Sequence, residues 1–240
     1  VDVYAEGLQF KAIKCYAAGE RNDMVWPMIR DNIRVPDLTM GDLEAQVAVC
    51  RIGAARHCEL LEQFGRATVT EAVEDLFDYS ERLMRSQIAA MPDGRYTATG
   101  YLDGYLDDAD PSRKQIPIVT TVVVAGDELT VDFAGSSPQI DDRPINMPFI
   151  GTVDVAVWLT LRSVLLDSDR FGDIPQNAGL YRPITITAPR GCIANPIFPA
   201  PSIARFAPGN VVADTLMRAL APAVPHNVSA GTANLKAIAF

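Results

Sequence analysis

The chain has 240 residues, of which 48% are hydrophobic and 21% are charged, which is typical of an ordinary globular protein. Its formal net charge of -9 argues against nucleic acid and anionic membranes as partners, because both favour a basic protein surface. No apolar run reaches the roughly 18 residues that a membrane-spanning helix needs.

The first strong patterns along the chain are helical. Arg21–Arg34 has the apolar spacing of a short helix. Thr39–Gly65 predicts a long helix, capped by its first residue together with Asp42 and ended by its glycine. The apolar set of this helix is wide, so we expect a central, mostly buried helix. Gly53 in its middle indicates a neighbour packed closely against it, because glycine is otherwise unfavourable in a helix.

A second long helix follows directly. Thr68 and Glu71 have the spacing of a capping box, and an apolar stripe continues from there to Ile88. Together the two helices predict a helical hairpin. Residues 1–94 are therefore expected to form a mainly helical part of the chain.

The periodicity then changes from helical to extended. Arg95–Leu106 alternates roughly by twos, which is typical of a strand. Ile116–Ala125 and Glu128–Phe133 are apolar and β-branched, and only Gly126-Asp127 separates them. A two-residue connection containing glycine between such runs predicts a β-hairpin.

The remainder mixes helices with short strands. Thr152–Asp167 and Asn210–Pro222 have helical spacing, the second with Asn210 as its cap, and Ile184–Thr187 is a short strand. The predicted fold class is α+β: a helical hairpin followed by an antiparallel sheet and further helices with short strands, with residues 95–240 as the mixed part.

Metal-binding and acid–base chemistry have weak signals. The acidic residues of 103–110 lack the spacing of an EF-hand loop, so a solvated turn is the preferred interpretation. His226 is the better candidate of two histidines for acid–base work, although a structural role in its loop is the commoner case. The cysteines show no CxxC spacing, so buried, reduced thiols in a cytoplasmic protein are expected; they are Cys15, Cys50, Cys58 and Cys192.

Three loops concentrate polar residues and glycine, at residues 141–148, 173–183 and 227–234. Asparagines in such loops usually bind nearby backbone groups, and this is the ordinary interpretation. The functional hypothesis is that the loops converge on a ligand or a neighbouring polypeptide. The residues that would meet there are Asn146, Asn177, Arg182 and Asn234.

Several segments, in order, resemble the hydantoinase B/oxoprolinase family, from Tyr4 to the end of the chain. Six segments in one order are more specific than any one of them. They are GDLEAQVAVCRIGAARHCELLEQFG, VDFAGSSPQ, RPINMP, DIPQNAGLYRPI, GCIANPIFPAPSIARF and NVSAGTANL.

The resemblance implies a reaction and a partner. Members of the family work with a hydantoinase A-type subunit that uses ATP, and together they open cyclic amides such as hydantoins, 5-oxoproline and lactams. Related complexes carboxylate ketones such as acetone. The resemblance also implies ATP on the partner and a divalent metal in other sections of the B-type subunit, with no cofactor or metal bound by this chain alone. The chain looks like a middle section of such a subunit, without its N- and C-terminal sections.

The leading hypothesis is therefore that the chain is part of a cytoplasmic, hetero-oligomeric cyclic amidase. Asn146, Asn177 and Asn234 would orient substrate or neighbouring loops, while Arg182 and Arg205 would meet a carboxylate or phosphate. No residue stands out as a nucleophile. Because the sequence has no phosphate-binding loop and no metal-ligand spacing, the isolated chain is expected to be inactive. The alternatives are a subunit of an ATP-dependent ketone carboxylase and a non-catalytic scaffold.

Overall fold

The computed structural model describes residues 2–231 and confirms the predicted α+β class. The helices are α1 (Val25–Asp31), α2 (Pro36–Phe64), α3 (Arg66–Ile88), α4 (Asp154–Leu165), α5 (Ser168–Phe171) and α6 (Phe206–Leu220). The strands are β1 (Tyr16–Ala17), β2 (Glu20–Arg21), β3 (Gly94–Asp103), β4 (Gln115–Ala125), β5 (Glu128–Asp132) and β6 (Ile184–Thr187). The chain divides into two compact units, Gly7–Glu74 and the combination of Val1–Glu6 with Asp75–Phe240.

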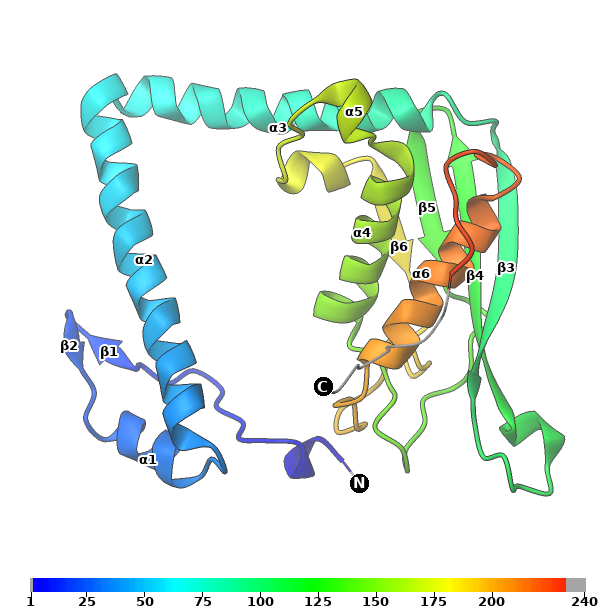
Figure 1. Cartoon of the computed structure of the whole chain (residues 1–240), viewed down its shortest axis with the longest axis horizontal. Coiled ribbons are helices and arrows are strands. Elements are labelled where there is room, and N and C mark those ends of the chain that lie inside the picture. The colour runs from blue at the N-terminus through cyan, green and yellow to red at the C-terminus, as the bar shows by residue number, and fades with distance from the viewer. Residues whose placement is uncertain (1, 232–240) are drawn as a thin grey trace. The chain divides into compact units, whose positions relative to one another are not determined.

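The larger unit is built on a sheet in the order β3-β4-β5-β6 (Figure 1). The predicted hairpin of β4 and β5 is confirmed, with Gly126 at a φ of 63° in the turn. β3 pairs with β4 antiparallel over its whole length. β6 pairs with β5 in parallel, so the sheet is mixed and not purely antiparallel as predicted. A parallel neighbour requires a long crossover, and the chain segment that contains α4 provides it.

The core lies between this sheet and two helices. α6 packs against β3 and β4, and α4 packs against α6, so both helices cover the same face of the sheet (Figure 1). β4 buries alternate side chains over much of its length, Ile118 and Val122 among them, against Leu161 of α4 and Leu216 of α6. The alternation that predicted the strands therefore also identifies the core face.

The smaller unit contains a short apolar cluster around α1 and the start of α2. Val25, Trp26 and Ile29 of α1 pack with Met40 of α2, and the Trp26 indole Nε1 donates to the Cys15 carbonyl at 3.1 Å. These residues cover only the first turns of α2. The cluster thus anchors one end of a long helix and leaves the rest of it without a covering element in this unit.

The predicted helix starts are wrong for three helices. α2 begins at Pro36, whose fixed φ suits a first helical turn, so Thr39 lies inside the helix and its hydroxyl donates to the Val35 carbonyl. α3 begins at Arg66 and α6 at Phe206, so Thr68 and Asn210 are not caps either. The stop at Gly65 is confirmed: its φ is 80°, a conformation that favours glycine.

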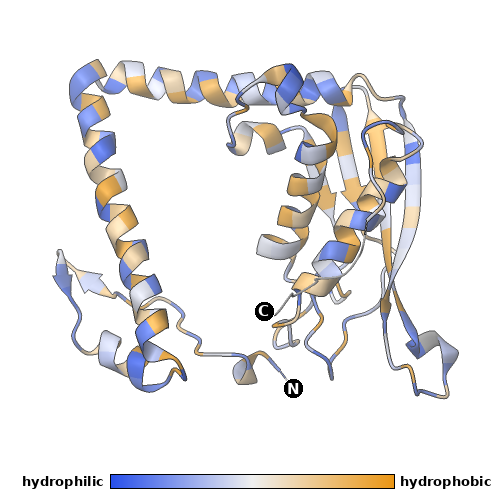
Figure 2. Cartoon of the chain, in the orientation of Figure 1, coloured by the Kyte–Doolittle hydropathy of each residue, from blue (hydrophilic) through white to orange (hydrophobic). Residues whose placement is uncertain are grey.

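The expectation that α2 is mostly buried is also wrong for the described chain. Met40 is its one buried residue among 29, whereas Val49 is 68% and Ile52 is 62% exposed. The reason is that apolar residues occur on several sides of α2 (Figure 2), while the unit offers one small cluster at one end. Cys50 and Cys58 are exposed for the same reason, so only Cys192 of the four thiols fits the prediction of buried cysteines.

Gly53 has no close neighbour, contrary to the sequence-based expectation. Apart from its chain neighbours and the backbone of its own helix turn, no described atom lies within 4 Å of where its Cβ would stand. Gly53→Ala is therefore expected to raise the free energy of unfolding by about 0.5–1 kcal/mol, because alanine restricts the unfolded chain and favours the helix. Thermal melts followed by far-ultraviolet circular dichroism measure this, with Ala54→Gly as the matched change of opposite sign. A loss of stability in Gly53→Ala would contradict the open environment.

Candidate functional site

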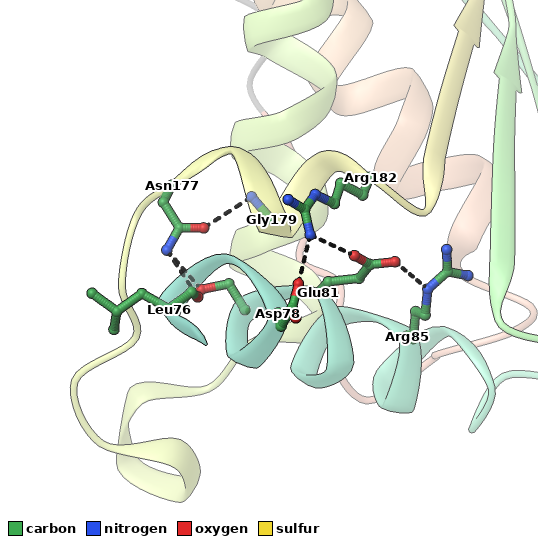
Figure 3. Close-up of polar contacts among 8 residues, drawn as sticks. Leu76, Asp78, Glu81, Arg85, Asn177, Gly179 and Arg182 are labelled. Atoms are coloured by element: carbon green, nitrogen blue, oxygen red, sulfur yellow. Dashed lines mark hydrogen bonds and ion pairs between the residues drawn. The ribbon is translucent and has the colours of Figure 1, made fainter. Parts of the chain in front are cut away.

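The polar loop at residues 173–183 lies against α3, and Asn177 holds it there (Figure 3). The Asn177 Nδ2 donates to the Ser80 Oγ at 2.9 Å and to the Leu76 carbonyl at 3.3 Å. Its Oδ1 accepts from the Gly179 backbone N–H at 2.9 Å, which caps the short 3-10 helix Ala178–Tyr181. One amide therefore orders its own turn and also ties that turn to a helix about a hundred residues earlier.

Gly179 allows the loop to approach the α3 backbone. A Cβ at this position would stand 2.0 Å from the Phe77 carbonyl oxygen and 2.9 Å from its Cα. Only glycine fits at such a distance, since the obstacle is helix backbone and not a movable side chain. The spacing of Asn177, Gly179 and Arg182 in the sequence thus corresponds to three successive contacts with α3.

Arg182 supplies the third contact through ion pairs. Its Nη1 lies 2.8 Å from the Asp78 Oδ1 and 3.1 Å from the Glu81 Oε2, and Glu81 also binds the Arg85 Nε at 2.8 Å (Figure 3). Hydrogen bonds from Arg85 and then Arg182 hold the pKa of Glu81 below its ordinary value, so this carboxylate is ionised at neutral pH. Arg85 continues the network to Asp127 at 3.3 Å.

We call this set of contacts the α3 clamp: Asn177, Gly179 and Arg182 on Leu76–Glu81. Its arginine is paired with carboxylates, and its buried hydroxyl, that of Ser80, accepts a hydrogen bond from Asn177. The arrangement positions a loop and does not activate a group for reaction. Burial raises the pKa of the neighbouring Tyr181 phenol, and it raises the pKa of the Cys192 thiol elsewhere in the unit, so neither is an activated nucleophile.

Asn146 has a different set of partners from the clamp. It is fully buried, and its Nδ2 donates to the carbonyls of Ile140 at 2.6 Å and Pro201 at 2.8 Å. Its Oδ1 accepts from the Ile140 backbone N–H at 2.8 Å. Asn146 therefore joins its own loop to the loop at residues 197–203, which is the ordinary structural role considered for such asparagines.

The other candidates are spread over the larger unit. Arg205 directly precedes α6, and its guanidinium lies 4.9 Å from the centre of the Phe206 ring. His226 lines a cavity near the end of α4 together with Arg162 and Arg170. Asn234 lies outside the described residues. Within residues 2–231 the structure thus joins Asn177 and Arg182 on α3 and gives Asn146 separate partners.

Some polar contacts had no recognisable signal in the sequence. The Glu6 carboxylate accepts from the backbone N–H groups of Ser202 at 2.6 Å and Ile203 at 2.8 Å. Ser80 and Glu81 lie within a regular helical pattern, so nothing distinguished them from solvated positions. Arg162 does carry a signal, because it is a lone basic residue in the apolar stretch that forms α4.

The acidic side chains of the described chain do not gather around a metal position. Within residues 2–231, no group of three or more histidine, cysteine, aspartate or glutamate side chains is placed to hold a metal ion. In the acidic segment, Asp108 pairs with Arg113 at 3.0 Å and accepts from the backbone N–H of Asp110 at 2.9 Å, as in a turn. None of the helices in that range combines the length and apolar character that crossing a bilayer requires.

Comparison with known proteins decides the family. The family model described as hydantoinase B/oxoprolinase matches residues 1–239. The chain belongs to the hydantoinase B/oxoprolinase family. It is 60% identical to the putative D-/L-hydantoinase B subunit of Pseudomonas sp. (strain NS671), over 100% of this chain and 40% of that protein. It is 29% identical to the β subunit of the caprolactamase of Pseudomonas jessenii, over 95% of this chain and 38% of that protein.

Solved structures of the family share the fold. The crystal structure of the ATP-dependent caprolactamase from Pseudomonas jessenii matches with a TM-score of 0.79 at 30% identity, over 94% of this chain and 37% of that one. The nucleotide-free structure of acetone carboxylase matches with a TM-score of 0.81 over 96% of this chain and 32% of that one, but at 16% identity, which establishes the fold alone. This hydantoinase B-type chain spans about two fifths of its curated relatives, and it matches their N-terminal part and not the expected middle.

Proposed function

We propose that this chain is part of the B-type subunit of an ATP-dependent complex that opens a small cyclic amide of the hydantoin, oxoproline or lactam type. The observation that carries the proposal is the 60% identity, over the whole chain, with a protein named as the B subunit of a hydantoinase. One relative is named as a caprolactamase β subunit, and one solved structure is that of an ATP-dependent caprolactamase. Both names support the same reaction class.

The proposed complex is a hetero-oligomer with a hydantoinase A-type subunit. Two relatives are named as single subunits of larger enzymes, which supports assembly with other chains. In this proposal ATP binds the A-type partner, and a divalent metal binds parts of the B-type polypeptide beyond this sequence. The chain's own contribution is to shape the site where the amide, once activated with ATP on the partner, is opened, and to bind neighbouring polypeptide.

The exposed part of α2 supports a role in assembly. Val49, Ile52, Leu60 and Phe64 are large apolar residues of this helix, and each is exposed in the described chain. Exposed apolar surface of this extent is typical of protein–protein contacts. The α3 clamp supports the shaping role, because it fixes the loop at residues 173–183 on a rigid helix.

A ketone carboxylase is the alternative function within the same family. The similarity to acetone carboxylase is one of fold at 16% identity, whereas the identity with the hydantoinase relative is 60%. Amide opening is therefore the preferred reaction. A non-catalytic scaffold is the third possibility, and the paired charges of the clamp are compatible with it.

Reconstitution tests the proposal. The full B-type polypeptide that contains this sequence would be combined with its A-type partner and supplied with ATP and hydantoin, 5-oxoproline or caprolactam. We expect ring opening coupled to ADP formation without bicarbonate, and no ATP or amide turnover by the 240-residue chain alone. Turnover that requires a ketone and bicarbonate would favour the carboxylase. Turnover of either kind by the other subunits that stays the same when the B-type polypeptide is omitted would favour the scaffold.

A further inference from the structure

A polar cavity of about 490 Å³ lies at the end of α4, apart from the α3 clamp. Its size is within the range of small-molecule sites in proteins. Three basic side chains line it: Arg162 from α4, Arg170 from α5 and His226 from the loop after α6. The cavity thus gathers basic side chains, two of them arginines, from three separate segments of a chain whose formal net charge is -9.

Among the described residues that line the cavity, Asp167 supplies the one carboxylate. The Asp167 Oδ1 accepts from the Asp169 backbone N–H at 2.9 Å, where Asp167 caps α5. Among the described residues, no salt bridge to a carboxylate is formed by Arg162, Arg170 or His226. The positive charge of the cavity therefore exceeds the negative charge that the described chain supplies to it.

Arg162 carries the clearest sign of a missing acceptor. The side chain is partly buried, and its Nε is a buried atom without a hydrogen-bond partner in the described chain. Buried donors in folded proteins are nearly always paired, and an exception calls for a bound water, ion or ligand. Arg170 is held over the Phe171 ring, with its guanidinium 4.9 Å from the ring centre. A cation–π contact of this kind does not use the N–H groups of the guanidinium, which stay available to bind an anion.

We propose that this cavity binds a small oxyanion, a phosphate or carboxylate group, between Arg162 and Arg170. A guanidinium presents parallel N–H donors that match two oxygens of either group, which gives both strength and orientation. His226 also lines the cavity, and its imidazole can add a third donor from the loop after α6. The proposal does not depend on the reaction assigned to the family, since it rests on the charges and the unpaired donor of this cavity.

Titration calorimetry of the full chain with inorganic phosphate, and separately with glutarate, tests the site at constant ionic strength. We expect saturable binding of at least one anion, and the preferred one distinguishes a phosphate from a carboxylate ligand. Arg162→Gln should weaken that binding about tenfold or more, because a hydrogen bond to a charged group is lost. Arg190→Gln is the control, since Arg190 is an exposed arginine outside the cavity lining and should leave the affinity unchanged.

A second variant protects the test against a folding defect. Arg170 is exposed, so Arg170→Gln should keep the melting temperature of the parent and still weaken binding. Absence of saturable binding of both anions by the parent chain would overturn the proposal. Binding that survives both cavity variants, or that Arg190→Gln reduces equally, would overturn it as well.

Discussion

Asn146→Ala is expected to lower the free energy of unfolding by about 3 kcal/mol, because three hydrogen bonds of the Asn146 side-chain amide are lost at once. The carbonyls of Ile140 and Pro201 and the Ile140 N–H all bind this amide, and the side chain itself is fully buried. Pro201 is 55 residues away in the sequence, so the loss also loosens one loop from another.

Chemical denaturation of the parent chain and of the variant measures this difference. Asn227→Ala is the matched control, because Asn227 is exposed and makes one described side-chain hydrogen bond, to the Val164 carbonyl at 3.1 Å. Its change should stay within about 0.5 kcal/mol, as for most surface substitutions. Equal stabilities of Asn146→Ala and the parent would mean that Asn146 does not join the two loops.

Gly179→Ala should destabilise the larger unit by about 2–3 kcal/mol. The added Cβ would stand 2.0 Å from the Phe77 carbonyl oxygen, so the loop must move off α3. Overpacking usually costs about 1–3 kcal/mol, and a helix backbone cannot give way as a side chain can. The displacement would also break the Asn177 bond to Ser80, which at present measures 2.9 Å.

Thermal unfolding of Gly179→Ala is compared with Gly41→Ala. Gly41 lies within α2, where a new Cβ would meet no described atom within 4 Å, so alanine there should be neutral or stabilising. Asn177→Ala should fall between the two, since it removes bonds without forcing the loop away. A Gly179→Ala chain with the melting temperature of the parent would show that the loop can leave α3 without loss of stability.

Local patterns accounted for the elements whose structure depends on neighbouring residues. The β4–β5 hairpin followed from alternating apolar residues around Gly126, and the end of α2 followed from Gly65, because each glycine occupies a backbone conformation that other residues avoid. The starts of α2, α3 and α6 did not follow from Thr39, Thr68 and Asn210. A capping residue is one of several ways to begin a helix, and Pro36 provided another.

The sequence by itself therefore determined the α+β class, most of the helices and strands, and the family, since these depend on periodicity, turn residues and ordered motifs. Only the tertiary structure decided which polar residues meet. Asn146 and Asn177 look alike in the sequence, yet one joins two loops and the other binds α3. Their partners lie 55 and 97 residues away, and no local pattern records such distances. The exposure of α2 was decided in the same way, because burial depends on which elements cover a helix and not on its apolar content.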